Sequence, residues 1–210
     1  MLASYTFNSS YHPPKEQTIS LPGLRLLEGG NFQPGDYAPI VMKQDQSIRL
    51  KFFQWNGFDP NATEDIKPYL SASHVLSSSE YSSLIRQHRC LIPVDAYYVT
   101  SGKGLSYKVS SPETGMFCFA GIYREWKDET GTMKYSFAIL STQACADVSP
   151  FGLLMPLILR RQEERIWLNT HAKLQYISRM LYQPCSLSLA VHPVYKLLEA
   201  SETYPKQIAA

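Results

Sequence analysis

The amino-acid sequence predicts an α+β protein in which strands outnumber helices, folded as a single domain over residues 1–210. Its 210 residues, 44% of them apolar, suffice to bury one substantial core and approach the upper size of one domain. Short segments rich in β-branched and aromatic residues recur through the middle of the chain. Few segments show apolar residues at helical spacing, and this mixture is typical of the α+β class.

The first predicted elements are two paired strands and a helix. The strand segments are rich in β-branched and aromatic residues, and Asp45 with Gln46 supplies a turn between them. The helix would begin after a serine N-cap, Ser77 or Ser78, with apolar residues at helical spacing behind it. These elements are the strands 36–43 and 47–55 and the helix 77–88.

The rest of the chain continues this pattern. The segment from Arg89 begins as a buried strand, and further strands are expected over 105–110, 116–126, 134–142 and 187–195. Turn-forming residues fill the gap 127–132 between two of them. Apolar residues at helical spacing predict two helices, over 160–168 and 173–181.

Composition excludes several classes of protein. The formal net charge of +2 neither requires nor excludes a nucleic-acid partner. The first twenty residues lack the pattern of a signal peptide, and the chain lacks a membrane-length apolar run, so we expect a cytoplasmic protein. The four cysteines are scattered singly, which favours reduced thiols over a metal site, and we expect neither metal nor cofactor. They are Cys90, Cys118, Cys145 and Cys185, and an unreactive thiol is also the default interpretation of Cys145.

Three segments, in this order, resemble one known family. They are "RCLIPVDAYYVT" (89–100), "FAGIYREW" (119–126) and "FAILSTQACADVSPFGLLMPLIL" (137–159). They resemble the SRAP family of SOS response-associated peptidase-like, abasic-site-processing proteins. Weaker similarity at 32–41, 52–58 and 166–168 extends the resemblance over most of the chain. The resemblance implies a single α+β domain built around a strongly curved, barrel-like mixed sheet with peripheral helices.

The resemblance also implies a chemistry. In that family a cysteine directly after the initiator methionine presents a thiol and an α-amine. Both attack the ring-opened aldehyde of an abasic site in single-stranded DNA and close a thiazolidine ring. An asparagine, a glutamate and a histidine hold the sugar and move protons, which is the logic of an activated nucleophile with positioned acid–base groups.

This sequence departs from the family pattern at each of those positions. The residues that stand there are Leu2 for the cysteine, Ser71 for the asparagine, Val99 for the glutamate and Gly152 for the histidine. Ser4, Ser73 and Leu154 stand where the family places arginines. The chain therefore resembles a catalytically degenerate member, with a former pocket that is drier and less polar.

Two classes of function remain open, with an enzyme of altered chemistry as a third. The first is a non-enzymatic binding or interaction module whose pocket accepts an unknown ligand or protein. The second is single-stranded DNA binding or abasic-site processing in the DNA damage response, with tyrosines such as Tyr97 and Tyr98 stacking on bases. The phosphate contacts in that case would be Arg86, Arg89, Lys103, Arg124 and Lys127. The loss of arginines at Ser4 and Leu154 favours the first class.

Overall fold

The computed structural model describes residues 2–7, 30–45, 47–56, 68–128, 130–183 and 185–194. Strands dominate these residues, as the sequence predicts, and four short helices accompany them. The strands are β1 (Leu2–Phe7), β2 (Gly30–Phe32), β3 (Tyr37–Gln44), β4 (Ser47–Trp55), β5 (Tyr69–Ser71), β6 (Arg89–Val94), β7 (Ala96–Thr100), β8 (Ser106–Ser110), β9 (Phe117–Lys127), β10 (Met133–Gln143), β11 (Leu154–Pro156), β12 (Ile158–Leu159) and β13 (Ala190–Pro193). The helices are α1 (Ala72–Ser77), α2 (Ser82–Gln87), α3 (Arg161–Leu168) and α4 (Leu174–Tyr182).

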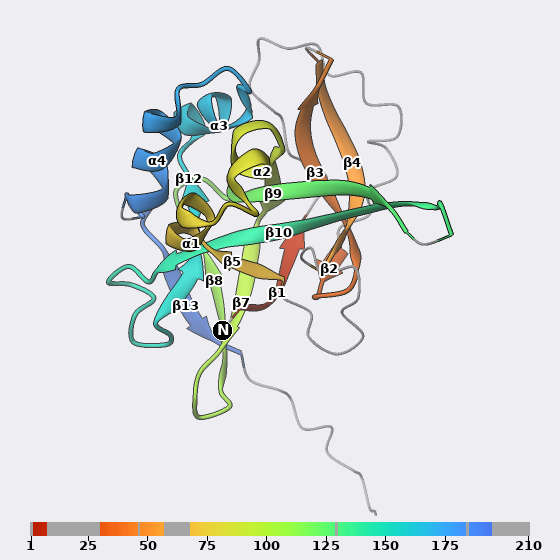
Figure 1. The fold of residues 1–210 in the computed structure, drawn as a ribbon. Coiled ribbons are helices and arrows are strands. Elements are labelled where there is room, and N and C mark those ends of the chain that lie inside the picture. The colour runs from red at the N-terminus through yellow and green to blue at the C-terminus, as the bar shows by residue number, and fades with distance from the viewer. Residues whose placement is uncertain are drawn as a thin grey trace, which may run out of the picture.

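Five strands close into a barrel. Following the hydrogen-bonded neighbours leads from β10 through β4, β3, β6 and β9 and back to β10 (Figure 1). The pair β10 and β4 is parallel, with Ser136 opposite Gln54, and the other four pairs are antiparallel. The sheet is therefore mixed and strongly curved, which confirms the predicted fold class.

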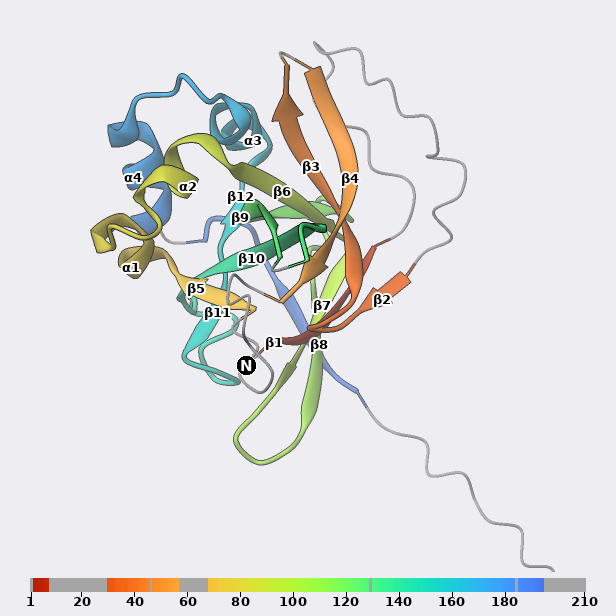
Figure 2. The same ribbon diagram turned by 45° about the vertical axis from the view of Figure 1, so that its right-hand side comes forward.

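The barrel strands carry apolar residues on both faces because both faces are covered. On β6 and β10, Ile92 and Ile139 join one buried cluster, whereas their neighbours Leu91 and Leu140 join a second cluster that also contains helix residues. Successive side chains of a strand point to opposite faces, so the first cluster fills the barrel and the second lies beneath the helices. Figure 2 shows the four helices grouped on one side of the barrel.

Gly121 on β9 allows two barrel strands to approach one another. A Cβ atom at this position would lie 2.4 Å from Cδ1 of Ile92 and 3.0 Å from the backbone oxygen of Ala138. Both distances are below normal van der Waals contact, so a side chain here requires the neighbouring strands to move apart. The "FAGIY" segment needs its glycine for packing across the sheet.

A second sheet has the strand order β13-β8-β7-β1-β2 and lies against the barrel. Tyr5 of β1 joins the two, because its ring centroid lies 5.4 Å from that of Phe32, 5.1 Å from Trp55 and 6.1 Å from Phe119. The sequence analysis assigned no strand to the first seven residues. The signal for β1 is present in its buried aromatic residues, but a single short segment without a recognisable turn partner does not reveal its place in a sheet.

The helix predicted over 77–88 is wrong in detail. The structure has two helices, and Ser77 is the last residue of α1 rather than an N-cap. Each helix buries its own apolar residue, Val75 in α1 and Ile85 in α2, and the polar residues between them form a turn. The last strand is also shorter than the predicted 187–195: β13 covers four residues, and residue 195 lies outside the described part of the chain.

Candidate ligand-binding site

Two residues predicted to stand at catalytic positions of the resembled family lie opposite one another. Leu2 of β1 pairs with Val99 of β7 in an antiparallel register, with an irregularity between Leu2 and Ser4. Leu2 is 7% exposed and Val99 is 2% exposed, and both belong to the cluster that fills the barrel. Side chains of directly paired residues are neighbours on one face of the sheet. This position is therefore an apolar contact between two strands, and neither side chain carries an ionisable group.

Tyr69 connects this pair to Ser71. The Tyr69 hydroxyl donates a hydrogen bond of 2.7 Å to the backbone oxygen of Leu2, and burial raises the pKa of that hydroxyl well above its usual value. Two residues later, Ser71 ends β5 and precedes α1, and its hydroxyl lies 2.8 Å from the hydroxyl of Ser73. The two serines predicted to stand for the family's asparagine and arginine are exposed and hydrogen-bonded to one another.

Gly152 lies in the loop between β10 and β11. Its amide donates a hydrogen bond of 3.3 Å to the backbone oxygen of Val148. The preceding residue, Phe151, packs its ring 4.4 Å from that of Tyr107, and Tyr107 is the β8 partner of Val99. The structure thus pairs Leu2 with Val99 directly and brings the Gly152 loop to the same region through Phe151.

Beside this region is a cavity of about 440 Å³. Hydroxyl, amide and thiol groups share its wall with apolar side chains. It is lined by Ser71, Ala72, Ser73, Ser141, Thr142, Gln143, Ala144, Cys145, Leu154, Leu181, Tyr182, Gln183 and Cys185. Among the described residues, no lining side chain is an Asp, Glu, Lys, Arg or His. The cavity mixes polar and apolar surface and carries no formal charge, so it suits an uncharged ligand that also forms hydrogen bonds.

Only part of this wall is predictable from the sequence. The family resemblance points to Ser71, Ser73 and Leu154, whereas Cys145 is expected to be an unreactive thiol. The remaining residues come from the end of β10, from α4 and from the segment after α4, and they belong to no motif. Polar residues at strand and helix ends are common, so nothing in the sequence alone marks them as neighbours.

Arg89, predicted to contact phosphate, has a structural role instead. It is 4% exposed, and burial lowers the pKa of its guanidinium to about 10. The group donates hydrogen bonds to four backbone oxygens at the ends of α2 and α3, those of Ile85, Arg86, Trp167 and Asn169. Carbonyl groups at a helix C-terminus lack partners within the helix and attract a positive charge. The phosphate prediction for Arg89 is therefore wrong.

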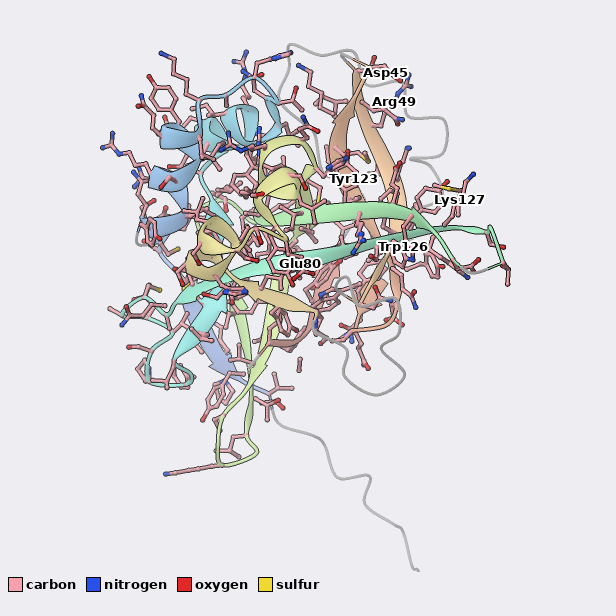
Figure 3. The ribbon with its side chains drawn as sticks, in the orientation of Figure 1. Asp45, Arg49, Glu80, Tyr123, Trp126 and Lys127 are labelled. Carbon is pink, nitrogen blue, oxygen red and sulfur yellow. The ribbon has the colours of Figure 1, made fainter. Side chains whose placement is uncertain are left out.

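The other predicted cations do not gather around the cavity. Arg86 is on α2, and Lys103 is in the loop after β7. Figure 3 shows Lys127 beside Trp126 near the outer end of β9, on the far side of the barrel from the helices. Arg124, also on β9, stacks over Trp126 at 5.9 Å. These four side chains therefore occupy three separate regions, namely α2, the loop after β7 and the outer part of β9.

The two tyrosines predicted to stack on bases differ in exposure. Tyr97 is fully buried, so the prediction that it stacks on a base is wrong, whereas Tyr98 is half-buried. Within the described ranges, no group of three or more His, Cys, Asp or Glu residues is placed to hold a metal ion. The helices of that same part of the chain are too short and too polar to cross a membrane.

Known structures share this architecture. A protein from Bacteroides thetaiotaomicron superposes with a TM-score of 0.68 at 21% sequence identity, covering 79% of this chain and 77% of the other. A protein from Bordetella bronchiseptica superposes with a TM-score of 0.70 at 14% identity, covering 92% of this chain and all of the other. At these identities the similarity shows a common fold.

Sequence comparison identifies curated relatives. The abasic site processing protein YoaM of Bacillus subtilis (strain 168) is 23% identical over 147 residues, and the match covers 66% of this chain and 65% of the relative. The abasic site processing protein YoqW of Bacillus phage SPbeta is 25% identical over 149 residues, covering 66% of each chain. The match thus spans about two thirds of the length of these relatives. The family profile of SRAP, the SOS response associated peptidases, matches residues 23–201, and the chain belongs to the SRAP family.

Proposed function

We propose that this chain is a non-catalytic binding module of the SRAP family, which holds an uncharged, hydrogen-bonding ligand in the cavity beside α1 and α4. The observation that carries the proposal is the chemistry of the cavity wall and of the neighbouring strand pair. Serine, threonine and glutamine side chains line the cavity, and Leu2 and Val99 form the apolar contact beside it. None of these groups titrates near neutral pH, so none is suited to general acid–base catalysis.

The packing around Val99 supports a replaced site. Val99 is 2% exposed and belongs to a cluster of apolar side chains. A carboxylate in such surroundings, without a hydrogen-bonding or cationic partner, would be destabilised by roughly a few kcal/mol through loss of its hydration. Valine avoids that penalty and adds apolar contacts. Valine at this position therefore stabilises the strand pair and cannot transfer a proton.

The names of the relatives favour a second candidate, non-covalent recognition of an abasic site in single-stranded DNA. The deoxyribose of such a site is uncharged and carries hydroxyl groups, which matches the lining of the cavity. The scattered positions of Arg86, Lys103 and Lys127 argue against a continuous phosphate-binding groove and in favour of weak DNA binding. This candidate differs from the first in its ligand and shares the absence of a covalent step.

A pair of assays on one sample separates these possibilities. The protein is mixed with a labelled abasic oligonucleotide, and half is measured by fluorescence anisotropy while half is denatured and run on a gel. The proposal predicts no gel-stable adduct without a reductant. Anisotropy that rises more for the abasic than for the intact oligonucleotide supports the second candidate, and equal or absent binding supports the first.

The positive control restores the family residues. A variant that combines Leu2→Cys, Ser71→Asn, Val99→Glu and Gly152→His tests whether the pocket still has a suitable shape. Adduct formation by this variant alone would attribute the missing chemistry to the replaced residues. A heat-stable adduct formed by the unaltered protein would overturn the proposal.

A further inference from the structure

Two thiols that lie far apart in the sequence line the same cavity. Cys145 is in the loop between β10 and β11, and Cys185 follows α4. Both side chains are partly exposed, and both pack against the cluster that fills the barrel. The other two cysteines, Cys90 and Cys118, are fully buried. Accessibility therefore divides the four thiols into a cavity pair and a core pair.

Backbone and side-chain contacts hold the two cavity segments together. The amide of Leu189 donates a hydrogen bond of 3.1 Å to Oδ2 of Asp147, which ties the segment after α4 to the loop after β10. The Cys185 thiol is oriented by a contact of 3.8 Å to the backbone oxygen of Leu187, and the Cys145 thiol is one of the groups that raise the pKa of Cys185. The two thiols thus lie on the wall of one cavity, within electrostatic reach of one another.

A buried tyrosine belongs to the cluster against which both thiols pack. The Tyr97 hydroxyl has no hydrogen-bond partner among the described residues, although Tyr97 is fully buried. Burial raises the pKa of this hydroxyl, and electrostatic interaction with Cys145 and Cys185 raises it further. A buried hydroxyl without a partner is unfavourable, and it can be satisfied by an oxygen or anion formed at a nearby sulfur.

We propose that Cys145 and Cys185 are a redox-active dithiol, which a peroxide converts into a disulfide across the wall of the cavity. The inference is independent of the ligand proposed above, because it concerns the two thiols of the cavity wall and not what the cavity binds.

The reaction proceeds in two balanced steps. The Cys145 thiolate attacks one oxygen of hydrogen peroxide, breaking the O–O bond and leaving a sulfenic acid and hydroxide. The Cys185 thiol then attacks the Cys145 sulfur, loses its proton as the S–S bond forms and displaces the sulfenic oxygen as hydroxide. The two protons lost by the thiols convert both hydroxides to water, so two thiols and one peroxide give one disulfide and two waters.

The surroundings assign the order of the two sulfurs. Burial, aided by neighbouring Cys145 and Asp147, raises the pKa of the Cys185 thiol to about 11, and the contact with Leu187 offsets this only in part. Cys185 therefore remains protonated near neutral pH and serves as the resolving thiol. In this proposal the Tyr97 hydroxyl, which lacks a partner among the described residues, donates to the oxygen of the Cys145 sulfenic acid.

The disulfide would restrict the cavity. It would connect the loop after β10 to the segment after α4, and both segments contribute to the cavity wall. Movement of one relative to the other is needed to widen the entrance between them. Oxidation would hold the two sides together and reduction would release them.

Peptide mass spectrometry tests this directly. The folded protein is treated with increasing hydrogen peroxide, blocked with N-ethylmaleimide, and digested with trypsin without reduction. The expected product links peptide 135–160, which contains Cys145, to peptide 180–196, which contains Cys185, and it disappears after dithiothreitol. Cys90 and Cys118 serve as internal controls and should remain reduced. Cys145→Ser and Cys185→Ser should each abolish the linked peptide.

A second probe measures proximity without oxidation. Phenylarsine oxide binds two thiols that reach one arsenic atom, and it should protect Cys145 and Cys185 from the maleimide with one arsenic per protein. Tyr97→Phe should slow disulfide formation several-fold without preventing arsenical binding. Further oxidation of Cys145 to sulfinic acid without a linked peptide, or linkage that includes Cys90 or Cys118 in the folded protein, would overturn the inference.

Discussion

Replacement of Arg89 by methionine should strongly destabilise the fold. Methionine keeps an unbranched apolar stem in the buried position but removes all the donors. The guanidinium supplies four hydrogen bonds, to the backbone oxygens of Ile85, Arg86, Trp167 and Asn169. At about 1 kcal/mol for each lost bond, the free energy of unfolding should fall by roughly 4 kcal/mol. The charge of Arg89 at two helix C-termini adds to this loss.

Urea denaturation followed by circular dichroism measures the effect. Lys103→Met is the matched control, because Lys103 is exposed in a loop and its replacement should change the free energy of unfolding by less than about 0.5 kcal/mol. The urea concentration at the unfolding midpoint should decrease for Arg89→Met and stay unchanged for Lys103→Met. If Arg89→Met is as stable as the control but binds single-stranded DNA less tightly, the structural role of Arg89 is refuted and the phosphate role restored.

Three further predictions concern the barrel, the surface and the cavity. Gly121→Ala should lower the free energy of unfolding by about 1–3 kcal/mol, because the added Cβ atom would lie 2.4 Å from Cδ1 of Ile92. Thermal denaturation measures the effect, and an unchanged thermal midpoint would contradict the close packing. Burial lowers the pKa of His88, opposed in part by Glu125, so the unfolded chain binds protons more readily. The free energy of unfolding should therefore show no loss from His88 above pH 6.5 and should decrease as the pH falls below that value. In urea titrations at several pH values, His88→Gln should make this decrease smaller. Leu154→Arg adds a cation to the cavity wall and should increase the affinity for single-stranded DNA. The slope of log affinity against log salt concentration should become steeper by about one. Unchanged binding would exclude the cavity from any DNA contact.

Much of the fold follows from apolar patterns in the sequence. Apolar strand segments of the sequence predict a core that contains Leu91, Ile92, Phe119, Ile139, Leu140 and Leu157, and all six are buried. Their split between the barrel interior and the helix side depends on alternation along each strand, which the sequence displays. Closure of the barrel came from the family resemblance, because the parallel pairing of β10 with β4 joins segments about eighty residues apart and no local signal specifies it.

The candidate site is less accessible to sequence reasoning. Arg89 is the first residue of a buried strand, and its sequence neighbours do not show that two helix ends converge on it. Cys145 and Cys185 become neighbours only through the packing of the segment after α4 against the loop after β10. Tyr97 and Tyr98 are adjacent and chemically alike, yet strand alternation buries one completely and leaves the other partly exposed. In each case the tertiary arrangement determines the role of a residue type that has several common roles.

Intact-protein mass spectrometry after incubation with abasic single-stranded DNA tests the central claim most directly. The unaltered protein should retain its unmodified mass without reductant, because Leu2 and Val99 provide neither the thiol nor the acid–base group of the family chemistry. The variant with Leu2→Cys, Ser71→Asn, Val99→Glu and Gly152→His, measured in parallel, should gain mass if the pocket keeps its shape. A mass increase by one oligonucleotide in the unaltered protein, stable to denaturation, would contradict the claim that the catalytic site has been replaced.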